Sequence, residues 1–527
     1  MTESTSFRSA LLYFKDKRLV TIFCFGLASG FPWIMIGSAM TAWLSDAGLT
    51  RTSIGLFGLI FGAYSFNFMW SPLVDRLKVP YLCKALGQRR GWIFAMQLII
   101  VLSCLAITQI EVEIGLATLA LCGLIIAISG ATQDIAIDAY RIDILYDKDK
   151  NYLAAGSAMA TSGWWTGYAG LGSIPFILAD NPNWQWQEIY YVLALIMLVV
   201  SIATFFAKEP VNNRAQTQAN IQQQYQFALV QHDKKPALML LPLMLIFTAI
   251  VLAFVDVGQH IISNNQQILL TSIVAVAGLV WLARLLYQLQ VNIHQLPQVQ
   301  YTEQSPTSVK IAAWVLSTLV APLQEFFQRN GVKLSLSLLA FIFLFKLGEA
   351  YLGRMSIVFY KEVGFSNSDI AYYSKLINWA VTIVFSLIGS IFTIRFGILK
   401  GLFIGGIAMA SSNLLFAVIA LVGPNKGLFA FTVIVDGFTS AWGSVAFVAL
   451  LSVLCNKTFT ASQYALMASL GTLARVLLGS YSGILVDALN GNWALFFVLT
   501  ALMVIPSLLF LYAIRKPINR LIESNSE

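Results

Sequence analysis

The sequence predicts an all-α polytopic membrane protein, and three observations support this fold class: the composition, the long apolar runs and the placement of basic residues. Hydrophobic residues make up 58% of the 527 residues and charged residues only 11%. The mean hydropathy is +0.74, far from that of a soluble domain of this length. Runs of about 20 apolar residues recur, each long enough to cross a hydrocarbon core of about 30 Å.

We predict fourteen membrane-spanning helices in a 6 + 2 + 6 arrangement. An N-terminal bundle (1–207) has spans at 19–44, 53–74, 91–110, 114–140, 151–179 and 186–207. A middle segment (208–334) has extra spans at 237–255 and 267–288. A C-terminal bundle (335–527) has spans at 335–360, 368–394, 398–422, 428–455, 460–488 and 493–514.

The middle segment also contains two polar stretches. The first, around the Gln-rich run 216–226, is predicted to be a flexible cytoplasmic linker. In the second, residues 309–329 have apolar side chains at helical spacing. This pattern predicts an amphipathic helix that lies along the membrane surface.

Basic residues predict the orientation, because Lys and Arg in short loops are retained in the cytoplasm. They collect before the first span and in alternate loops, at Arg8, Lys15, Lys17, Arg18, Arg76, Lys78, Lys84, Arg89, Arg90, Lys148, Lys150, Lys208, Lys234, Lys235, Arg395, Lys400, Lys457, Arg515 and Lys516. The opposite loops carry only Arg51, Lys361 and Lys426. Both termini are therefore predicted to be cytoplasmic. Topology and anionic headgroups account for the net charge of +8, so no nucleic-acid partner is expected.

Enzyme chemistry and metal binding have no local support. The five cysteines form no CxxC pair, and the three histidines (His232, His260, His294) are scattered. No phosphate-binding glycine loop or GxSxG motif is present. We expect neither a metal nor a cofactor.

Charged residues inside apolar runs are the candidates for function, because burying charge in lipid is expensive. Asp134, Asp138 and Arg141 follow an i, i+4, i+7 spacing and share one helix face, whereas Asp143 points elsewhere. If this span enters near Gly115, these residues lie roughly 27 Å or more along it. We therefore interpret Asp138 and Arg141 as an inner gate or anchor, with Gln133 and Asp134 touching cargo as it leaves.

Two six-helix halves joined by a cytoplasmic link form the architecture of major facilitator transporters, in which the substrate site lies between the halves. A weak internal repeat agrees, since a shift of 312 residues superimposes Gly167 on Gly479. Helix packing alone would also explain that repeat. Asp75 and Arg76 begin a basic loop that could hold the inner ends of helices together, although a topology signal is the alternative.

Several strings make the resemblance more specific. The sequence resembles the AmpG-type muropeptide permeases across almost all of both halves, at Phe25–Pro32, Ala63–Tyr64, Trp70–Arg76, Gln133–Asp138, Lys346–Glu349, Ala446–Leu451 and Leu454–Lys457. The resemblance implies import of disaccharide-anhydro-muropeptides across a Gram-negative inner membrane by proton symport, driven by the proton motive force. Two departures affect substrate detail. Asn67 stands where a Lys is usual, and the two extra spans lie between the halves rather than after them.

Helix rise places four charged residues of the second half within the membrane. Lys346 and Glu349 lie roughly 17–21 Å from their entry point, Asp436 about 12 Å from the outer side and Arg475 roughly 22 Å from the inner side. We predict that Lys346 and Glu349 pair. Glu349 is the first candidate for proton coupling, followed by Asp436 and then Asp134. Lys346 and Arg475 would attract peptide carboxylates. A buried structural ion pair is the alternative for Lys346 and Glu349.

The first half offers a polar and aromatic lining instead. Tyr64, Asn67 and Trp164 are candidates for holding sugar, together with Gln133, and Lys375 of the second half is a further substrate-binding candidate. Packing is the alternative for the aromatic residues, and snorkelling to the interface for Lys375. Gly26, Gly30 and Pro32 are expected to break the first helix, unless they serve packing alone.

Three functional classes remain: a proton-coupled muropeptide permease, a transporter of another bulky anion such as acetyl-coenzyme A, and a membrane receptor or enzyme. The second would need a denser cationic site, and the third a sensory domain or catalytic motif. The sequence favours the first, acting as a monomer in the inner membrane.

Overall fold

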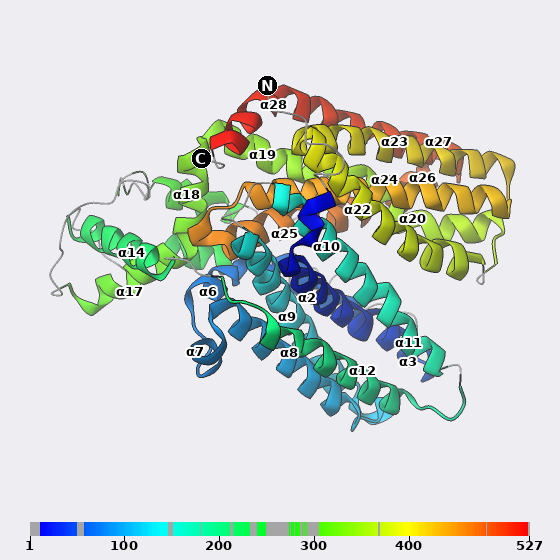
Figure 1. Ribbon diagram of the computed structural model, residues 1–527, viewed down its shortest axis with the longest axis horizontal. Coiled ribbons are helices and arrows are strands. Elements are labelled where there is room, and N and C mark those ends of the chain that lie inside the picture. Colours follow the sequence, from blue (N-terminus) through cyan, green and yellow to red (C-terminus); the bar gives the residue numbers. More distant parts are fainter. Residues whose placement is uncertain are drawn as a thin grey trace. The chain divides into compact units, whose positions relative to one another are not determined.

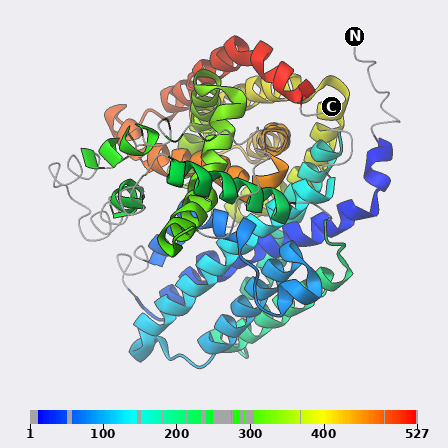
Figure 2. The same cartoon turned by 90° about the vertical axis from the view of Figure 1, so that its left-hand side faces the viewer.

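The computed structural model describes residues 11–49, 57–145, 151–179, 181–210, 214–231, 240–248, parts of 273–291, 305–366, 369–480 and 482–524, with some side chains excepted. Throughout these residues the regular elements are helices. The chain divides into two compact units, Met1–Val211 with Lys333–Glu527, and Asn212–Val332. The first unit combines an N-terminal and a C-terminal half, which lie side by side (Figures 1 and 2).

Six groups of helices build the N-terminal half. They are α2 (Lys17–Ile34), a π-helical turn (Met35–Ala39) and α3 (Met40–Asp46); η3 (Gly58–Phe61), α5 (Gly62–Phe66), η4 (Asn67–Met69) and α6 (Ser71–Arg76); α8 (Gln88–Ile107), preceded by the short α7 (Leu82–Leu86); α9 (Val112–Leu145); α10 (Asn151–Trp165), η5 (Thr166–Gly170), η6 (Leu171–Ser173) and α11 (Ile174–Ala179); and α12 (Trp186–Ser201) with α13 (Ala203–Phe206).

The C-terminal half contains α19 (Val332–Phe345), α20 (Leu347–Val363), η8 (Ile370–Ile377), α22 (Asn378–Phe396), α23 (Ile398–Val422), α24 (Lys426–Val453), η9 (Lys457–Phe459), α25 (Thr460–Ser480), α26 (Ser482–Ala488), α27 (Trp493–Leu502) and α28 (Val504–Ser524). We call the end at which α2, α10 and α25 begin the inner end. It is the end that the basic loops predict to be cytoplasmic.

Ten helices within the described residues are long and apolar enough to cross a membrane. Two predicted spans, 53–74 and 151–179, are instead chains of shorter helical pieces. The first is interrupted on both sides of Asn67, where Phe66 and Trp70 have φ near −106° and −108° with ψ near zero. Such interrupted helices are tolerated in membranes where they face protein or a cavity. The polytopic all-α fold is confirmed, whereas the 6 + 2 + 6 count stays a prediction.

Glycines bring α2 and α10 into close contact. A Cβ added to Gly30 would lie 2.1 Å from the carbonyl oxygen of Trp164, and one added to Gly163 would lie 2.2 Å from that of Phe23. Small residues allow such backbone approach. The expected break at Gly26, Gly30 and Pro32 is wrong, because α2 runs through all three and the distortion follows at Met35–Ala39.

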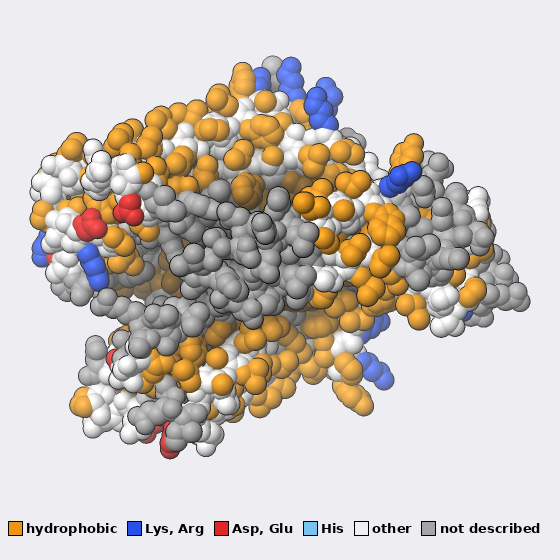
Figure 3. Space-filling view, turned by 180° about the vertical axis from the view of Figure 1, so that it is seen from behind, with side chains coloured by type: hydrophobic (Ala, Val, Ile, Leu, Met, Phe, Trp, Pro, Cys, Tyr) orange, Lys and Arg blue, Asp and Glu red, His pale blue; other side chains and the backbone are white. Residues whose placement is uncertain are grey.

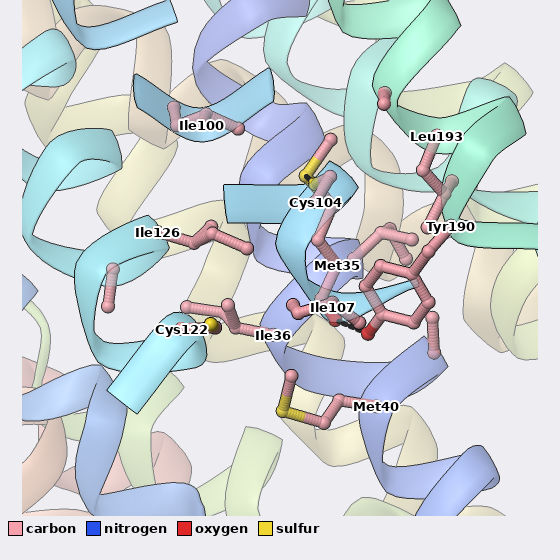
Figure 4. Close-up of a cluster of buried hydrophobic side chains, with 14 of the residues drawn as sticks. Met35, Ile36, Met40, Ile100, Cys104, Ile107, Cys122, Ile126, Tyr190 and Leu193 are labelled. Atoms are coloured by element: carbon pink, nitrogen blue, oxygen red, sulfur yellow. Dashed lines mark hydrogen bonds between the residues drawn. The ribbon is translucent and has the colours of Figure 1, made fainter. Parts of the chain in front are cut away.

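An apolar cluster around that distortion forms the core of the N-terminal half (Figure 4). The Tyr190 hydroxyl donates a hydrogen bond of 2.7 Å to the carbonyl oxygen of Met35. Met35 and Tyr190 are fully buried, with Cys104 and Ile107 beside them. Tyr190 thus satisfies a backbone acceptor that the altered helical pattern leaves available.

Large apolar side chains remain exposed on the outward helix faces of this unit, including Leu195, Phe206, Leu421 and Leu509. In the described parts of the face shown in Figure 3, hydrophobic side chains predominate and few charged groups lie among them. A surface of this kind fits contact with lipid rather than water.

The second unit contains α14 (Arg214–Gln231), α17 (Thr307–Val315), a π-helical turn (Leu316–Val320) and α18 (Ala321–Asn330). The prediction of a flexible linker at the Gln-rich stretch is wrong, because Ile221, Tyr225 and Leu229 form a buried stripe along α14. Tyr225 donates a hydrogen bond of 2.5 Å to the Gln324 side chain. The predicted spans 237–255 and 267–288 lie largely outside the described residues.

Candidate functional site

A cavity of about 740 Å³ lies between the two halves of the first unit. Its N-terminal wall is aromatic, with Trp33 from α2 and Trp164, Trp165 and Tyr168 from α10 and η5. Its C-terminal wall is polar and charged, with Glu349 from α20, Asp436 from α24 and Arg475 from α25 among its residues. The cavity therefore has two chemically different sides.

The aromatic wall is a connected set of rings. Trp164 and Tyr168 stack with centroids 5.0 Å apart and planes 23° apart. The ring of Trp33 meets that of Trp164 edge-on, with centroids 6.0 Å apart. The centroid of the Tyr64 ring, behind Trp33, is 4.5 Å from that of Trp33. Tyr168 lies about one helical turn after Trp164. It belongs to the π-helical segment η5 (Thr166–Gly170), which links α10 to η6. Flat apolar faces of this kind suit the apolar faces of sugar rings.

Glu349 lies between two cations. Its Oε2 accepts a hydrogen bond of 2.5 Å from Lys346 Nζ, and its Oε1 accepts one of 3.0 Å from Arg475 Nη2. The Lys346 side chain is 8% exposed, whereas that of Arg475 is 53% exposed. The predicted pairing of Lys346 with Glu349 is observed, and Arg475 is the cation that reaches into the open part of the cavity.

Lys346 stands at a break in its span. It separates α19 from α20, and its backbone, with φ −90° and ψ 2°, is not helical. Its ammonium group also lies 3.3 Å from Ser444 Oγ and 5.5 Å from the ring centroid of Phe447. The interruption places a buried charge beside the cavity, and discontinuous helices often line binding sites in transporters.

Asp436 is the second acid that lines the cavity. Its Oδ1 accepts a hydrogen bond of 3.0 Å from Ser412 Oγ, and Thr439 Oγ1 is 3.2 Å from the same serine oxygen. Among the described side chains, no Lys or Arg lies within ion-pair distance of Asp436. Its surroundings therefore differ from those of Glu349.

The inner ends of the two halves are joined by a buried polar network centred on Arg89. The Arg89 guanidinium donates hydrogen bonds of 2.8 Å to Asp75, 2.9 Å to Asp143 and 2.7 Å to Thr460 of the C-terminal half. Thr460 in turn donates to Asp143 at 2.9 Å. The amide and hydroxyl of Ser462 both donate to Asp75, at 2.8 Å and 2.6 Å. Asp75 thus accepts from the first turn of α25, where helix N–H groups favour an anion.

Glu209 fixes the start of α8, which carries Arg89. Its carboxylate accepts hydrogen bonds of 2.8 Å and 3.2 Å from the backbone amides of Arg89 and Arg90. Burial raises the pKa of Glu209, and the two amide hydrogen bonds oppose that shift. The amides at this helix start are therefore satisfied by a side chain from the end of the N-terminal half.

Two further contacts cross between the halves at the inner end. The Arg141 guanidinium pairs with Asp138 at 3.1 Å and lies 5.1 Å from the ring centroid of Tyr464. Further along α25, Ser469 Oγ donates a hydrogen bond of 2.6 Å to Asn67 Oδ1. Asn67 is therefore placed in the contact between halves, not in the lining of the cavity.

Three other predicted residues lie behind the aromatic wall. Gln133 is fully buried, and its side-chain amide donates a hydrogen bond of 2.7 Å to the carbonyl oxygen of Ala28. Tyr64 is 6% exposed, and its hydroxyl has no hydrogen-bond partner among the described residues. Asp134 lies one residue beyond Gln133, and its Oδ1 is buried and unpartnered within the same described set. None of the three lines the cavity.

Two predicted residues cannot be placed in the site. The backbone of Lys375 belongs to the π-helical segment Ile370–Ile377, and its side chain lies outside the described residues. Arg76 ends α6 beside Asp75, and burial lowers its pKa to about 10. Asp75 is instead held by Arg89 and Ser462.

Sequence reasoning missed Arg89 and Asp143 as members of one network. The sequence places Asp143 on a different helix face from Asp134 and Asp138, and that different direction brings it to Arg89 and Thr460. Over the part of the chain that the structure describes, no cluster of three His, Cys, Asp or Glu residues could hold a metal ion.

Comparison with known proteins agrees with this architecture. Residues 23–223 match the family model described as acetyl-coenzyme A transporter 1, and residues 292–516 match the model described as sugar (and other) transporter. The chain is 27% identical to the AmpG 4 transporter of Rickettsia conorii over 96% of this chain and 98% of that protein. It is 26% identical to the anhydromuropeptide permease of Escherichia coli (strain K12), over 96% of this chain and 81% of that protein.

Among solved structures, the proton:xylose symporter XylE bound to 6-bromo-6-deoxy-D-glucose has a similar fold, with a TM-score of 0.58 and 12% identity over 96% of each chain. The chain therefore has the multi-pass fold of the major facilitator proteins, and the family models and relatives that it matches are described as transporters or permeases. Within that class, the resemblance to the AmpG-type permeases is confirmed, since it extends along about the whole chain.

Proposed function

We propose that the protein imports GlcNAc-anhydroMurNAc-peptides from the periplasm to the cytoplasm by proton symport, through alternating access of the cavity. The observation that carries this proposal is the two-sided cavity, with an aromatic wall facing Arg475 and two acids. The substrate has the same two parts, a disaccharide and a peptide with carboxylates. The similarity to a protein named anhydromuropeptide permease supports the match.

The aromatic side suits the disaccharide. Trp33, Trp164, Trp165 and Tyr168 offer ring faces and edges to the cavity. The opposite wall adds small polar side chains, including Asn378, Thr382 and Asn413, that can hydrogen-bond to hydroxyl and acetamido groups. A pocket that combines a few polar groups with aromatic surface can fix the orientation of a ligand.

The charged side suits the peptide. Arg475 presents a half-exposed guanidinium to the cavity, and this group can bind a carboxylate through two parallel hydrogen bonds. In the structure, Arg475 binds the carboxylate of Glu349. We infer that a substrate carboxylate competes with Glu349 for Arg475 and Lys346.

The inner network and the basic loops support the proposed direction of transport. The Arg89 network and the Asn67–Ser469 contact hold the halves together at the inner end. If that end is cytoplasmic, as the loops predict, the structure corresponds to a state closed toward the cytoplasm. Substrate and protons would enter from the periplasm, and breaking the network would release them inside the cell.

The proton motive force would supply the energy. Each charge that crosses the membrane potential is worth about 2.3 kcal/mol per 100 mV. Glu349 and Asp436 are the acids that line the cavity, so either can exchange a proton with it. Asp134 lies behind the aromatic wall and is the third candidate.

Transport of acetyl-coenzyme A is the second candidate, because a family model of that description matches residues 23–223. Its phosphates would require several cations at one site. The described lining offers Arg475, with Lys346 beside it. This density of positive charge fits carboxylates better than a polyphosphate.

Binding to the purified full-length protein separates the two candidates. We expect GlcNAc-anhydroMurNAc-peptide to bind and to be displaced by the same unlabelled compound, with acetyl-coenzyme A at least tenfold weaker. Tighter binding of acetyl-coenzyme A, or no binding of the muropeptide, contradicts the proposal.

A further inference from the structure

The two acids of the cavity have opposite surroundings, and this difference bears on which one binds the transported proton. Both oxygens of Glu349 are engaged by cations, Lys346 at 2.5 Å and Arg475 at 3.0 Å. The described contact of Asp436 is a neutral hydroxyl, Ser412 at 3.0 Å. Both carboxylates line the same cavity.

Adding a proton to Glu349 would remove the one negative charge between two cations. In a site of low dielectric constant, two neighbouring cations without an anion repel strongly. Partial burial favours a neutral carboxyl group, but nearby opposite charges favour the ionised form. Glu349 therefore resists protonation until another anion takes its place.

Asp436 has no such compensation. The charged or titratable groups in the same lining are Glu349 and Tyr360 from α20 and Arg475 from α25. Lys375 belongs to η8, and its side chain lies outside the described residues. The described lining residues of α22 and α23 are uncharged, namely Asn378, Thr382, Met409 and Asn413. A carboxylate removed from water and supported by one hydroxyl gains more from a proton than one held by two cations.

We propose that Asp436 carries the transported proton, while Glu349 stays ionised and acts as the exchangeable partner of Arg475 and Lys346. This assignment rests on the proposed symport. A proton from the outer aqueous phase binds an Asp436 oxygen and converts the carboxylate to a neutral carboxyl group. A substrate carboxylate then displaces Glu349 from Arg475. After the inner end opens, the substrate leaves, Glu349 returns to Arg475, and the Asp436 proton passes to the cytoplasm.

Two assays on the full-length protein in proteoliposomes test this division. One measures accumulation of labelled GlcNAc-anhydroMurNAc-peptide driven by a pH gradient, and the other measures exchange against internal unlabelled compound at equal pH. We expect Asp436→Asn to lose accumulation at least tenfold and to keep exchange within about threefold of the unaltered protein. Glu349→Gln should change the apparent affinity in both assays and still accumulate substrate.

The opposite pattern overturns the assignment, as does accumulation by Asp436→Asn at the level of the unaltered protein. Failure of the unaltered protein to exchange the compound at all contradicts the proposed function itself. If the Asp436→Asn protein neither exchanges nor accumulates the compound, the Ser412→Ala variant tests the assignment instead. Loss of the Ser412 hydrogen bond disfavours the ionised carboxylate, so the pH of half-maximal accumulation should rise by about one unit.

Ser411→Ala is the matched control, because Ser411 is exposed and its hydroxyl donates a hydrogen bond to the Ile407 carbonyl oxygen of its own helix. Its pH profile should coincide with that of the unaltered protein. A Ser412→Ala profile that is equally unchanged overturns the assignment to Asp436.

Discussion

Arg89 in the N-terminal half donates a hydrogen bond of 2.7 Å to Thr460 in the C-terminal half, and both residues are buried. The same guanidinium pairs with Asp75 and Asp143. Thr460 is the first residue of α25. Arg89, in the first turn of α8, therefore links the end of α6, the end of α9 and the start of α25 across the two halves.

Removing this arginine should loosen the inner closure. Arg89→Ala would remove the buried cation that pairs with both Asp75 and Asp143, which costs about 3–5 kcal/mol. Thr460→Val removes hydrogen bonds but no charge, so we expect a loss of about 1 kcal/mol per bond. The measurement is the rate of maleimide labelling of Cys455, which is buried in the C-terminal half just after α24. The labelling rate should rise strongly in Arg89→Ala and slightly in Thr460→Val. Equal rates in all three proteins contradict the closing role of Arg89.

Arg475 should determine recognition of the peptide part. Arg475→Met removes the half-exposed cation, so the affinity for GlcNAc-anhydroMurNAc-peptide should fall at least tenfold, equivalent to about 1.4 kcal/mol. The disaccharide whose lactyl carboxyl group is converted to an amide serves as the control ligand, because it has no carboxylate. Equilibrium binding to the purified protein measures both. A similar loss for both ligands would show that Arg475 supports the site as a whole.

Trp164 should determine recognition of the sugar part. Trp164→Ala removes the ring that stacks on Tyr168 and meets Trp33, so both ligands should bind at least tenfold more weakly. Trp164→Phe keeps an aromatic face and should recover part of the affinity. Unchanged disaccharide binding in Trp164→Ala would remove the aromatic wall from the sugar site.

Close packing of α2 on α10 should make Gly30 intolerant of a side chain. A methyl group there would lie 2.1 Å from the Trp164 carbonyl oxygen, and the two backbones would have to separate. We expect Gly30→Ala to destabilise the protein by about 1–3 kcal/mol. Gly471→Ala is the control, because its nearest neighbour would be at 3.9 Å. Thermal unfolding in detergent measures both, and equal midpoints would contradict the packing argument.

The helix at 307–330 is long and apolar enough to cross the membrane, although the sequence predicts that it lies along the surface. A crossing here would invert the C-terminal half and place Arg395, Lys400 and Lys457 outside, against the distribution of basic residues. We therefore expect cysteines introduced at Ser308 and Arg329 to be labelled from the same side of the membrane. Labelling from opposite sides would contradict surface placement.

Much of the architecture could be predicted from the sequence, because lipid imposes strong constraints on helix length and charge. Lys346 and Glu349 could be paired because an i, i+3 spacing places them on one helix face. The join between Arg89 and Thr460 could not be predicted in the same way. It connects residues 371 positions apart, and spacing along one helix carries no information about such a contact.

The errors have local physical causes. The Gln-rich stretch looked like a linker, yet glutamine forms helices well and the apolar residues of α14 recur at helical spacing. Gln133 was predicted to touch substrate, but the structure turns it toward the backbone of α2. A buried amide inside a membrane protein needs a partner as much as one at a binding site does.

Uptake by proteoliposomes that contain only this protein tests the central claim most directly. GlcNAc-anhydroMurNAc-peptide should accumulate inside the vesicles when the outer solution is more acidic than the inner one. After collapse of the pH gradient, the internal concentration of the compound should rise no higher than the external concentration. Uptake no greater than that of empty vesicles, or accumulation unaffected by collapse of the gradient, would contradict the account.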